Sequence, residues 1–101
     1  MDDAELLRTV ADRLERVAGR STPGDWRIGG LLATRPEVLA HRPDGSTEHV
    51  AEARAGTAAW IAAFSPAVAE PLARWLRDTA DHSPAEPSAL AVARGLLERL
   101  H

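Results

Sequence analysis

The feature that most limits this chain is its small supply of bulky side chains. Its 101 residues include only four aromatic ones, Trp26, Trp60, Phe64 and Trp75, although 45% of the residues are apolar. Much of that apolar fraction is alanine, which fills little volume, so the leucines and the four rings must supply most of the core. A chain of this length supports one small core. We therefore predict a single domain over residues 1–101 with a thin, alanine-rich interior.

Composition and charge exclude several classes of protein. The chain has no cysteine, so it forms no disulfide, no thiolate zinc site and no cysteine nucleophile. A formal net charge of -3 argues against a strong, sequence-independent hold on nucleic acid. The first segment, Met1 to Arg20, begins with acids and has no apolar signal segment. We expect a cytoplasmic protein that contacts no membrane and does not take nucleic acid as its partner.

A first helix is predicted over Asp3 to Arg20, because apolar residues recur there at helical spacing. It ends at Gly19, before the helix-breaking segment Ser21–Gly24. Charged residues flank the apolar stripe, which suits contact with a partner helix. The sequence does not decide whether this helix packs within its own chain or against another chain. The candidate interaction surface consists of Leu6, Val10, Leu14 and Val17.

Between Trp26 and Glu52 the pattern changes to short β-capable runs separated by glycine and proline. The turn Pro43-Asp44-Gly45 predicts a hairpin. A two-residue loop would place Leu39 opposite Val50 and His41 opposite Glu48, whereas a three-residue loop with a bulge would place Val38 opposite Val50. The sequence leaves this register open. The runs are Trp26–Ile28, 31–34, Val38–His41 and Thr47–Ala51.

Helical spacing returns at Ala55 and predicts a short helix that stops at Ser65-Pro66. Another helix follows, and Pro71 predicts either a kink or a start delayed toward Glu70. Its expected inward stripe is Val68, Leu72, Trp75, Leu76 and Thr79. Ser88 is predicted to cap a last helix that runs to Leu100.

Together these elements predict an α+β fold. It has an N-terminal helix, a small antiparallel sheet of two to four strands with a hairpin at Pro43–Gly45, and then two or three helices packed on one face of the sheet. We expect Trp26 to fold under the Thr22–Gly24 turn and cover the sheet. We also expect Trp60, Phe64 and Trp75 in the core, since they lie at helical core spacing.

Two stretches give the chain a family resemblance. They are Ser21-Thr22-Pro23-Gly24-Asp25-Trp26 and the segment 50–68, which contains Ala58-Ala59-Trp60-Ile61-Ala62-Ala63-Phe64-Ser65-Pro66. In these the chain resembles the small "TPGPW" proteins of actinobacterial phages and prophages, and is similar to Ead-type early phage proteins. It departs from their pattern at Asp25, where the family often has proline, and at Thr57, where aspartate is common. The resemblance implies a phage accessory protein, and it carries over no catalytic residue.

Candidate ligand residues gather in and beside the predicted strands. Guanidinium groups on an open sheet face suit phosphate or carboxylate, although the nearby acids suit them equally well as ion-pair partners. Gly29 and Gly30 would let such a ligand approach the backbone. His41 and His49, without cysteine or a helical histidine motif, are weak evidence for a metal, and we predict none. The candidate residues are Trp26, Arg27, His41, Arg42 and Arg54.

No pattern of hydroxyl, histidine and carboxylate indicates a catalytic site, so we predict neither an enzyme nor a cofactor. The favoured function is a non-enzymatic interaction or assembly module of phage or prophage origin. It would act as a homo-oligomer or bind a host protein, because a small alanine-rich core gains stability from association. The alternative is a binder of small anionic ligands that sequesters a nucleotide signal, using Trp26 and the sheet arginines.

Overall fold

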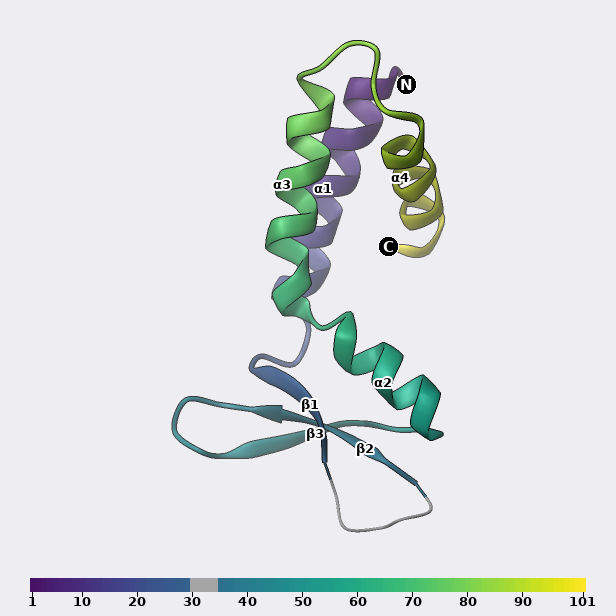
Figure 1. The fold of residues 1–101 in the computed structure, drawn as a ribbon. Coiled ribbons are helices and arrows are strands. Elements are labelled where there is room, and N and C mark those ends of the chain that lie inside the picture. Colours follow the sequence, from purple (N-terminus) through teal and green to yellow (C-terminus); the bar gives the residue numbers. More distant parts are fainter. Residues whose placement is uncertain (30–34) are drawn as a thin grey trace. The chain divides into compact units, whose positions relative to one another are not determined.

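The computed structural model of the chain describes residues 1–29 and 35–101. Its mixed architecture confirms the predicted α+β class, with an N-terminal helix, an antiparallel sheet and later helices (Figure 1). The predicted run 31–34 and Gly30 lie outside the described residues. Among the described residues, no helix has the length and apolar character needed to cross a bilayer. The elements are α1 (Asp3–Gly19), β1 (Asp25–Gly29), β2 (Glu37–His41), β3 (Thr47–Glu52), α2 (Ala55–Ala63), the 3-10 turn η1 (Pro66–Val68), α3 (Ala69–Ala80) and α4 (Pro87–Arg99).

Contacts along the chain group into two compact units. The helical unit is discontinuous in sequence, because it is formed by residues 1–20 and 69–101. The inserted unit, residues 21–68, holds the sheet, α2 and η1. Each unit has its own buried residues, and the assignment of residues 1–101 to one domain stays a prediction.

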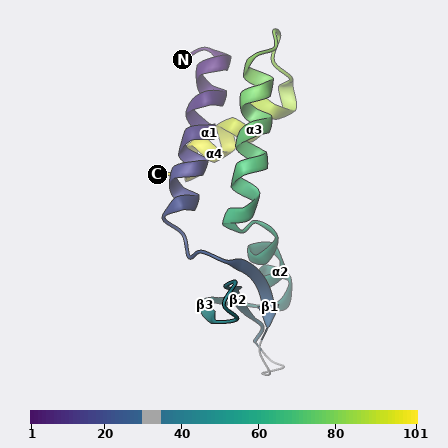
Figure 2. The same ribbon diagram turned by 90° about the vertical axis from the view of Figure 1, so that its left-hand side faces the viewer.

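The core of the helical unit forms where α1 packs against α3 and α4. In both ribbon views α1 and α3 run side by side (Figures 1 and 2). Leu6 and Val10 of α1 are buried in this core, and Leu14 packs against it. We therefore correct the prediction that this stripe is an interaction surface, because three of its members already face the chain's own helices. Val17, the fourth member, is half-buried.

Helix α3 begins at Ala69, which agrees with the start delayed toward Glu70 that Pro71 predicted. Pro71 lies in the first turn, where a backbone amide has no acceptor within the helix, so the missing N–H costs no hydrogen bond. The inward residues differ from the predicted stripe: Ala69, Ala73 and Leu76 are buried, whereas Trp75 is 37% exposed. Leu76 is buried as predicted and packs with Ala73 in the core shared with α1, whereas the expectation of a core position for Trp75 is wrong.

The last helix starts at Pro87, one residue before its predicted cap. Glu86 is the N-cap residue and makes no side-chain capping bond, while Pro87 occupies the first turn. Ser88 lies inside the helix, and its hydroxyl donates a hydrogen bond to the carboxylate of Glu86. The prediction that Ser88 caps this helix is therefore wrong. Proline at the first helical position, which needs no amide donor, marks the start instead.

Ion pairs on the surface of the helical unit join α1 to α3. Arg77 donates to Asp12 Oδ1 from Nη2 at 2.8 Å and to the carboxylate of Glu15 from Nη1. The hydrogen bonds to Asp12 and Glu15 raise the pKa of the Arg77 guanidinium above its ordinary value. Because all three side chains are partly exposed to solvent, these ion pairs contribute little to the free energy of folding.

The three strands form an antiparallel sheet in the order β1-β2-β3. The hairpin between β2 and β3 has a three-residue loop, since the Arg42 amide donates to the Ser46 carbonyl at 2.9 Å. His41 lies opposite Thr47, and Leu39 lies opposite His49. The register then shifts by one residue, so that Val38 lies opposite Ala51.

Both predicted registers of this hairpin are wrong. The three-residue loop and a bulge are present, but Val50 is the extra residue of the bulge and therefore does not face Val38. Gly45, with φ of +86°, supplies the positive backbone angle that the turn needs. The Val50 position matters beyond the turn, because it sets which residues of β3 share a face with Val38.

One face of the sheet is covered by α2, which contacts β1 and β2. Val38 and Ala40 of β2 are buried, as is Ala58 of α2. These side chains are small enough for helix and sheet to approach closely, and they form the core of the inserted unit. The prediction placed two or three of the later helices on one sheet face; α2 takes this position, and α3 and α4 belong to the helical unit.

Replacing Leu7 with alanine should destabilise the helical unit strongly. Leu7 and Leu76 are the largest of its fully buried side chains, and the alanines around Leu7 have little bulk with which to refill the space. We expect a loss of about 2–5 kcal/mol in the free energy of unfolding. Urea denaturation followed by circular dichroism measures this loss. Val92→Ala, at an exposed position of α4, is the control, and equal effects of the two variants would contradict the assigned core.

Candidate functional site

Helix α2 is apolar on all sides, which is unusual for a short helix at the surface of a small protein. The sequence from Ala55 to Ala69 contains no charged residue. A helix with apolar residues on every face is normally enclosed by protein. Here α2 buries Ala58, whereas Trp60 is 67% exposed and Phe64 is 56% exposed. The helix therefore presents its largest side chains to solvent.

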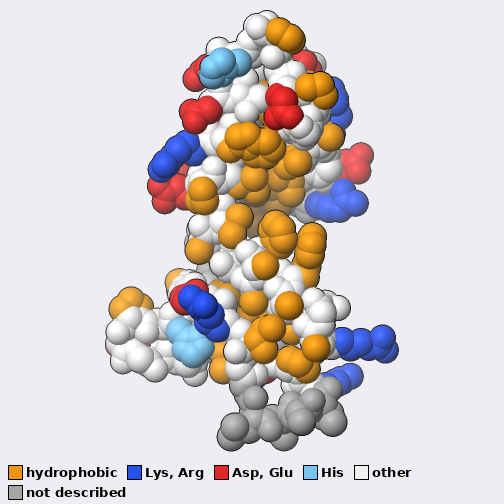
Figure 3. All heavy atoms as spheres, viewed as in Figure 1, with side chains coloured by type: hydrophobic (Ala, Val, Ile, Leu, Met, Phe, Trp, Pro, Cys, Tyr) orange, Lys and Arg blue, Asp and Glu red, His pale blue; other side chains and the backbone are white. Residues whose placement is uncertain are grey.

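The two exposed rings form a pair. The centroids of Trp60 and Phe64, one helical turn apart, are separated by 4.6 Å with their planes tilted by 33°. Ala63, also exposed, lies on the same side of the helix at the corresponding spacing. We call Trp60, Ala63 and Phe64 the aromatic face of α2. On the side of the molecule shown in Figure 3, hydrophobic side chains gather in the region of α2.

This exposure corrects the expectation that Trp60 and Phe64 lie in the core. In a helix that is apolar all round, the spacing of apolar residues does not indicate which side is buried. The size of the side chains that face the sheet decides this instead. Ala58 allows α2 to approach the buried Val38 and Ala40 of the sheet more closely than a tryptophan would. The sequence signal that could have revealed this arrangement is the lack of any polar side on α2.

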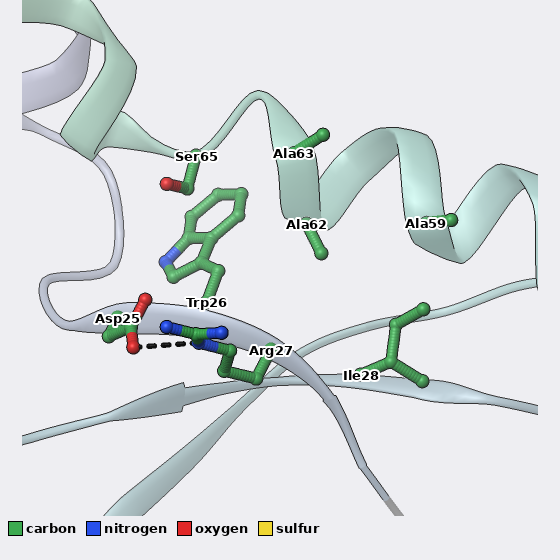
Figure 4. Close-up of a pocket in the computed structure, with 8 residues that line it drawn as sticks. All are labelled: Asp25, Trp26, Arg27, Ile28, Ala59, Ala62, Ala63 and Ser65. Carbon is green, nitrogen blue, oxygen red and sulfur yellow. Dashed lines mark hydrogen bonds and ion pairs between the residues drawn. The ribbon is translucent and has the colours of Figure 1, made fainter.

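Next to the aromatic face, an open groove of about 410 Å³ lies between β1 and α2 (Figure 4). Trp26 forms part of its floor, and its ring is fixed because Nε1 donates to the Thr22 carbonyl oxygen at 2.9 Å. This bond confirms that Trp26 folds back under the Thr22–Gly24 turn. Gly24 has φ of +120°, and a Cβ there would come within 2.9 Å of the His41 carbonyl oxygen. The groove is lined by Asp25, Trp26, Arg27, Ile28, Ala59, Ala62, Ala63 and Ser65.

The predicted ligand residues are only partly brought together. Trp26 and Arg27 line the groove, whereas His41, Arg42 and Arg54 are not among its lining residues. Arg54 is instead the N-cap residue of α2. His41, at the end of β2, is exposed and lies opposite Asp25 and Thr47. The five residues therefore do not form one site.

Most of the arginines in the inserted unit are matched by acids. Arg27 Nε lies 2.8 Å from Asp25 Oδ2, and Arg42 pairs with the carboxylate of Glu48. Arg35 Nη1 lies 3.7 Å from Glu52 Oε1. A phosphate would have to compete with carboxylates for these guanidinium groups, so the arrangement favours ion pairing within the sheet over anion binding.

The histidines of the sheet do not form a metal site in the part of the chain that is described. His49 Nδ1 contacts the carboxylate of Glu37 across β2 and β3. Within residues 1–29 and 35–101 there is no group of three or more histidine, cysteine or acidic side chains placed to hold a metal ion.

Comparison of the chain with protein-family models, with curated proteins and with solved structures found no match. The resemblance to the small phage proteins therefore stays a prediction. The aromatic face of α2 and the adjoining groove are the most distinctive features of the inserted unit.

The tip of the hairpin holds the one carboxylate in the described residues with a clearly shifted pKa. Asp44 Oδ1 accepts hydrogen bonds from the Ser46 hydroxyl at 2.6 Å and from the Ser46 amide at 2.8 Å. These bonds favour the charged form and lower the pKa of Asp44 from its ordinary value of 3.8. Ionised Asp44 therefore stabilises the turn above pH 3.8, and this contribution is lost as the pH falls through the lowered pKa.

Ser46→Ala should raise the pKa of Asp44 part of the way back to 3.8, because the hydroxyl donor is lost while the backbone donor remains. A titration of the Asp44 carboxyl carbon by NMR measures the change. Ser46→Thr, which keeps both donors, should leave the pKa low. If both variants titrate like the wild type, the hydroxyl does not set the Asp44 pKa.

Proposed function

We propose that this chain is a non-enzymatic interaction module that self-associates through the aromatic face of α2. The observation that carries the proposal is the exposure of the Trp60–Phe64 ring pair on a helix without charge. Exposed aromatic rings lower the solubility of a small protein unless a partner covers them. Tryptophan is also among the residues that contribute most to binding energy at protein interfaces.

A second copy of the chain suits this surface better than a charged partner does. In a symmetric dimer the same patch meets itself, so like charges on the patch would repel. From Ala55 to Ala69 the sequence offers no charge to repel. If two α2 helices pack antiparallel, Arg54 at the start of each helix comes near the carbonyl end of the other, where a positive charge is stabilised.

Self-association would also add to the small apolar area that the inserted unit buries by itself. The buried apolar residues of the inserted unit are chiefly Val38, Ala40 and Ala58, which cover little area. Burial of two tryptophans and two phenylalanines between two copies adds more apolar area than any of these three residues supplies. The proposal keeps the expected cytoplasmic setting, and it keeps a host protein as a further partner.

Alanine at both Trp60 and Phe64 should weaken self-association by at least about 30-fold, the effect of losing one strong interface anchor. Sedimentation equilibrium over a range of concentrations gives the dissociation constant, and circular dichroism checks that the variant is folded. Val92→Ala, at an exposed apolar position of α4, should leave the constant unchanged. A wild-type chain that stays monomeric at millimolar concentration would refute the proposal.

The same proposal predicts that nucleotides do not stabilise the protein. Arg27 and Arg42 are paired with Asp25 and Glu48, so a phosphate gains little by binding them. We expect no change in the melting temperature across a panel of mononucleotides, cyclic nucleotides and inorganic phosphate at millimolar concentration. A rise of several degrees with one of them, abolished by Arg27→Ala, would support the anionic-ligand alternative instead.

A further inference from the structure

Strand β1 has a free edge beside the groove. In the described part of the sheet its neighbour is β2, and its other side carries no strand. Four consecutive residues of β1, Asp25 to Ile28, line the groove under α2. An edge strand offers unpaired backbone N–H and C=O groups to another strand. A groove between such an edge and a helix is a place where an added strand can lie.

The charges on β1 limit which strand fits there. Asp25 and Arg27 lie on one face of the sheet, and Trp26, between them, lies on the face toward α2 (Figure 4). Arg27 pairs with Asp25 while their side chains remain 70% and 58% exposed. An antiparallel copy of the same strand runs in the opposite direction. Each acid then meets a base when the two strands are centred on Trp26.

We propose that two copies of the chain join through their β1 strands, with Trp26 opposite the second copy's Trp26. In this register Asp25 of each copy faces Arg27 of the other, and two three-stranded sheets become one continuous sheet. The inference rests on the proposed self-association and specifies its geometry. Opposite charges directly across from each other stabilise a strand pair, and an aromatic pair between them adds to this.

Neighbouring registers that keep both helices on the same face of the sheet are disfavoured. Centring the pair on Arg27 would place two arginines opposite each other, and centring it on Asp25 would place two aspartates opposite each other. Pro23 has no backbone N–H, which further limits pairing toward the start of the strand. The charges therefore select a single alignment.

The groove has room for this arrangement. The groove side of α2 consists of Ala59, Ala62 and Ala63, whose short side chains leave a volume of about 410 Å³ open beside Trp26. The indole of the second copy lies in this space, next to the first. Because the twofold axis stands perpendicular to the joined sheet, both α2 helices are on the same face of it. Strand pairing and helix contact are therefore compatible in one dimer.

Charge reversal tests the register directly. Asp25→Arg alone places arginine opposite arginine twice per dimer, and Arg27→Asp alone places aspartate opposite aspartate twice. Each variant should raise the dimer dissociation constant by about tenfold or more. Mixing the two variants restores both opposite-charge pairs in trans, so the mixture should form a heterodimer with an affinity near that of the wild type. Sedimentation equilibrium of each variant and of the equimolar mixture measures this.

The mixture separates intermolecular pairing from the ion pair within one strand, because neither variant in the mixture regains its own Asp25–Arg27 pair. If the wild type dimerises but both variants dimerise equally well, the β1 geometry is wrong and the proposed self-association stands. The same conclusion follows if the mixture fails to dimerise. If the wild type itself is monomeric at millimolar concentration, the proposed function falls first. Circular dichroism of each variant shows that lost association is not lost folding.

Discussion

The structure depends on alanine as a core residue. In the helical unit the fully buried side chains include Ala11, Ala73 and Ala93, and the largest at the same depth are Leu7, Leu76 and Val10. Alanines let backbones approach closely, so helices pack tightly with few large side chains. The consequence is a shallow interior with limited burial. Rings that a richer core would enclose instead lie at the surface, where they become available for contact between molecules.

Local chemistry made much of the fold predictable. The first helix is bounded by Asp2, whose carboxylate accepts from the Glu5 amide at 2.7 Å, and by the glycine that follows its apolar stripe. The hairpin turn followed from Pro43 and Gly45, since proline and glycine fix the backbone angles that such a turn requires. The delayed start of α3 at Ala69, which leaves Pro71 in the first turn, followed from the amide that proline lacks. Each of these features is set by residues close to it in the sequence.

The features that the sequence did not predict depend on contacts between residues that are distant in the sequence. Val50 is the extra residue of a bulge in the pairing of β3 with β2, and no turn residue signals it. Trp60 and Phe64 have the spacing of core residues, yet the small Ala58 faces the sheet instead. The candidate site was therefore only partly predictable: Trp26 and Arg27 were identified, but the groove beside them requires knowing that α2 lies over β1. An alanine-rich sequence weakens hydrophobic periodicity as a guide, because alanine suits either side of a helix.

Because the inserted unit interrupts the helical unit in the sequence, the parts of the helical core are translated at different times. Helix α1 is synthesised before the sheet, whereas α3 and α4, which pack with Leu7 and Val10, are synthesised after it. During that interval the apolar residues of α1 lack the later helices that cover them in the folded chain. Nascent chains therefore expose the apolar residues of α1 while residues 21–68, about half of the sequence, are translated.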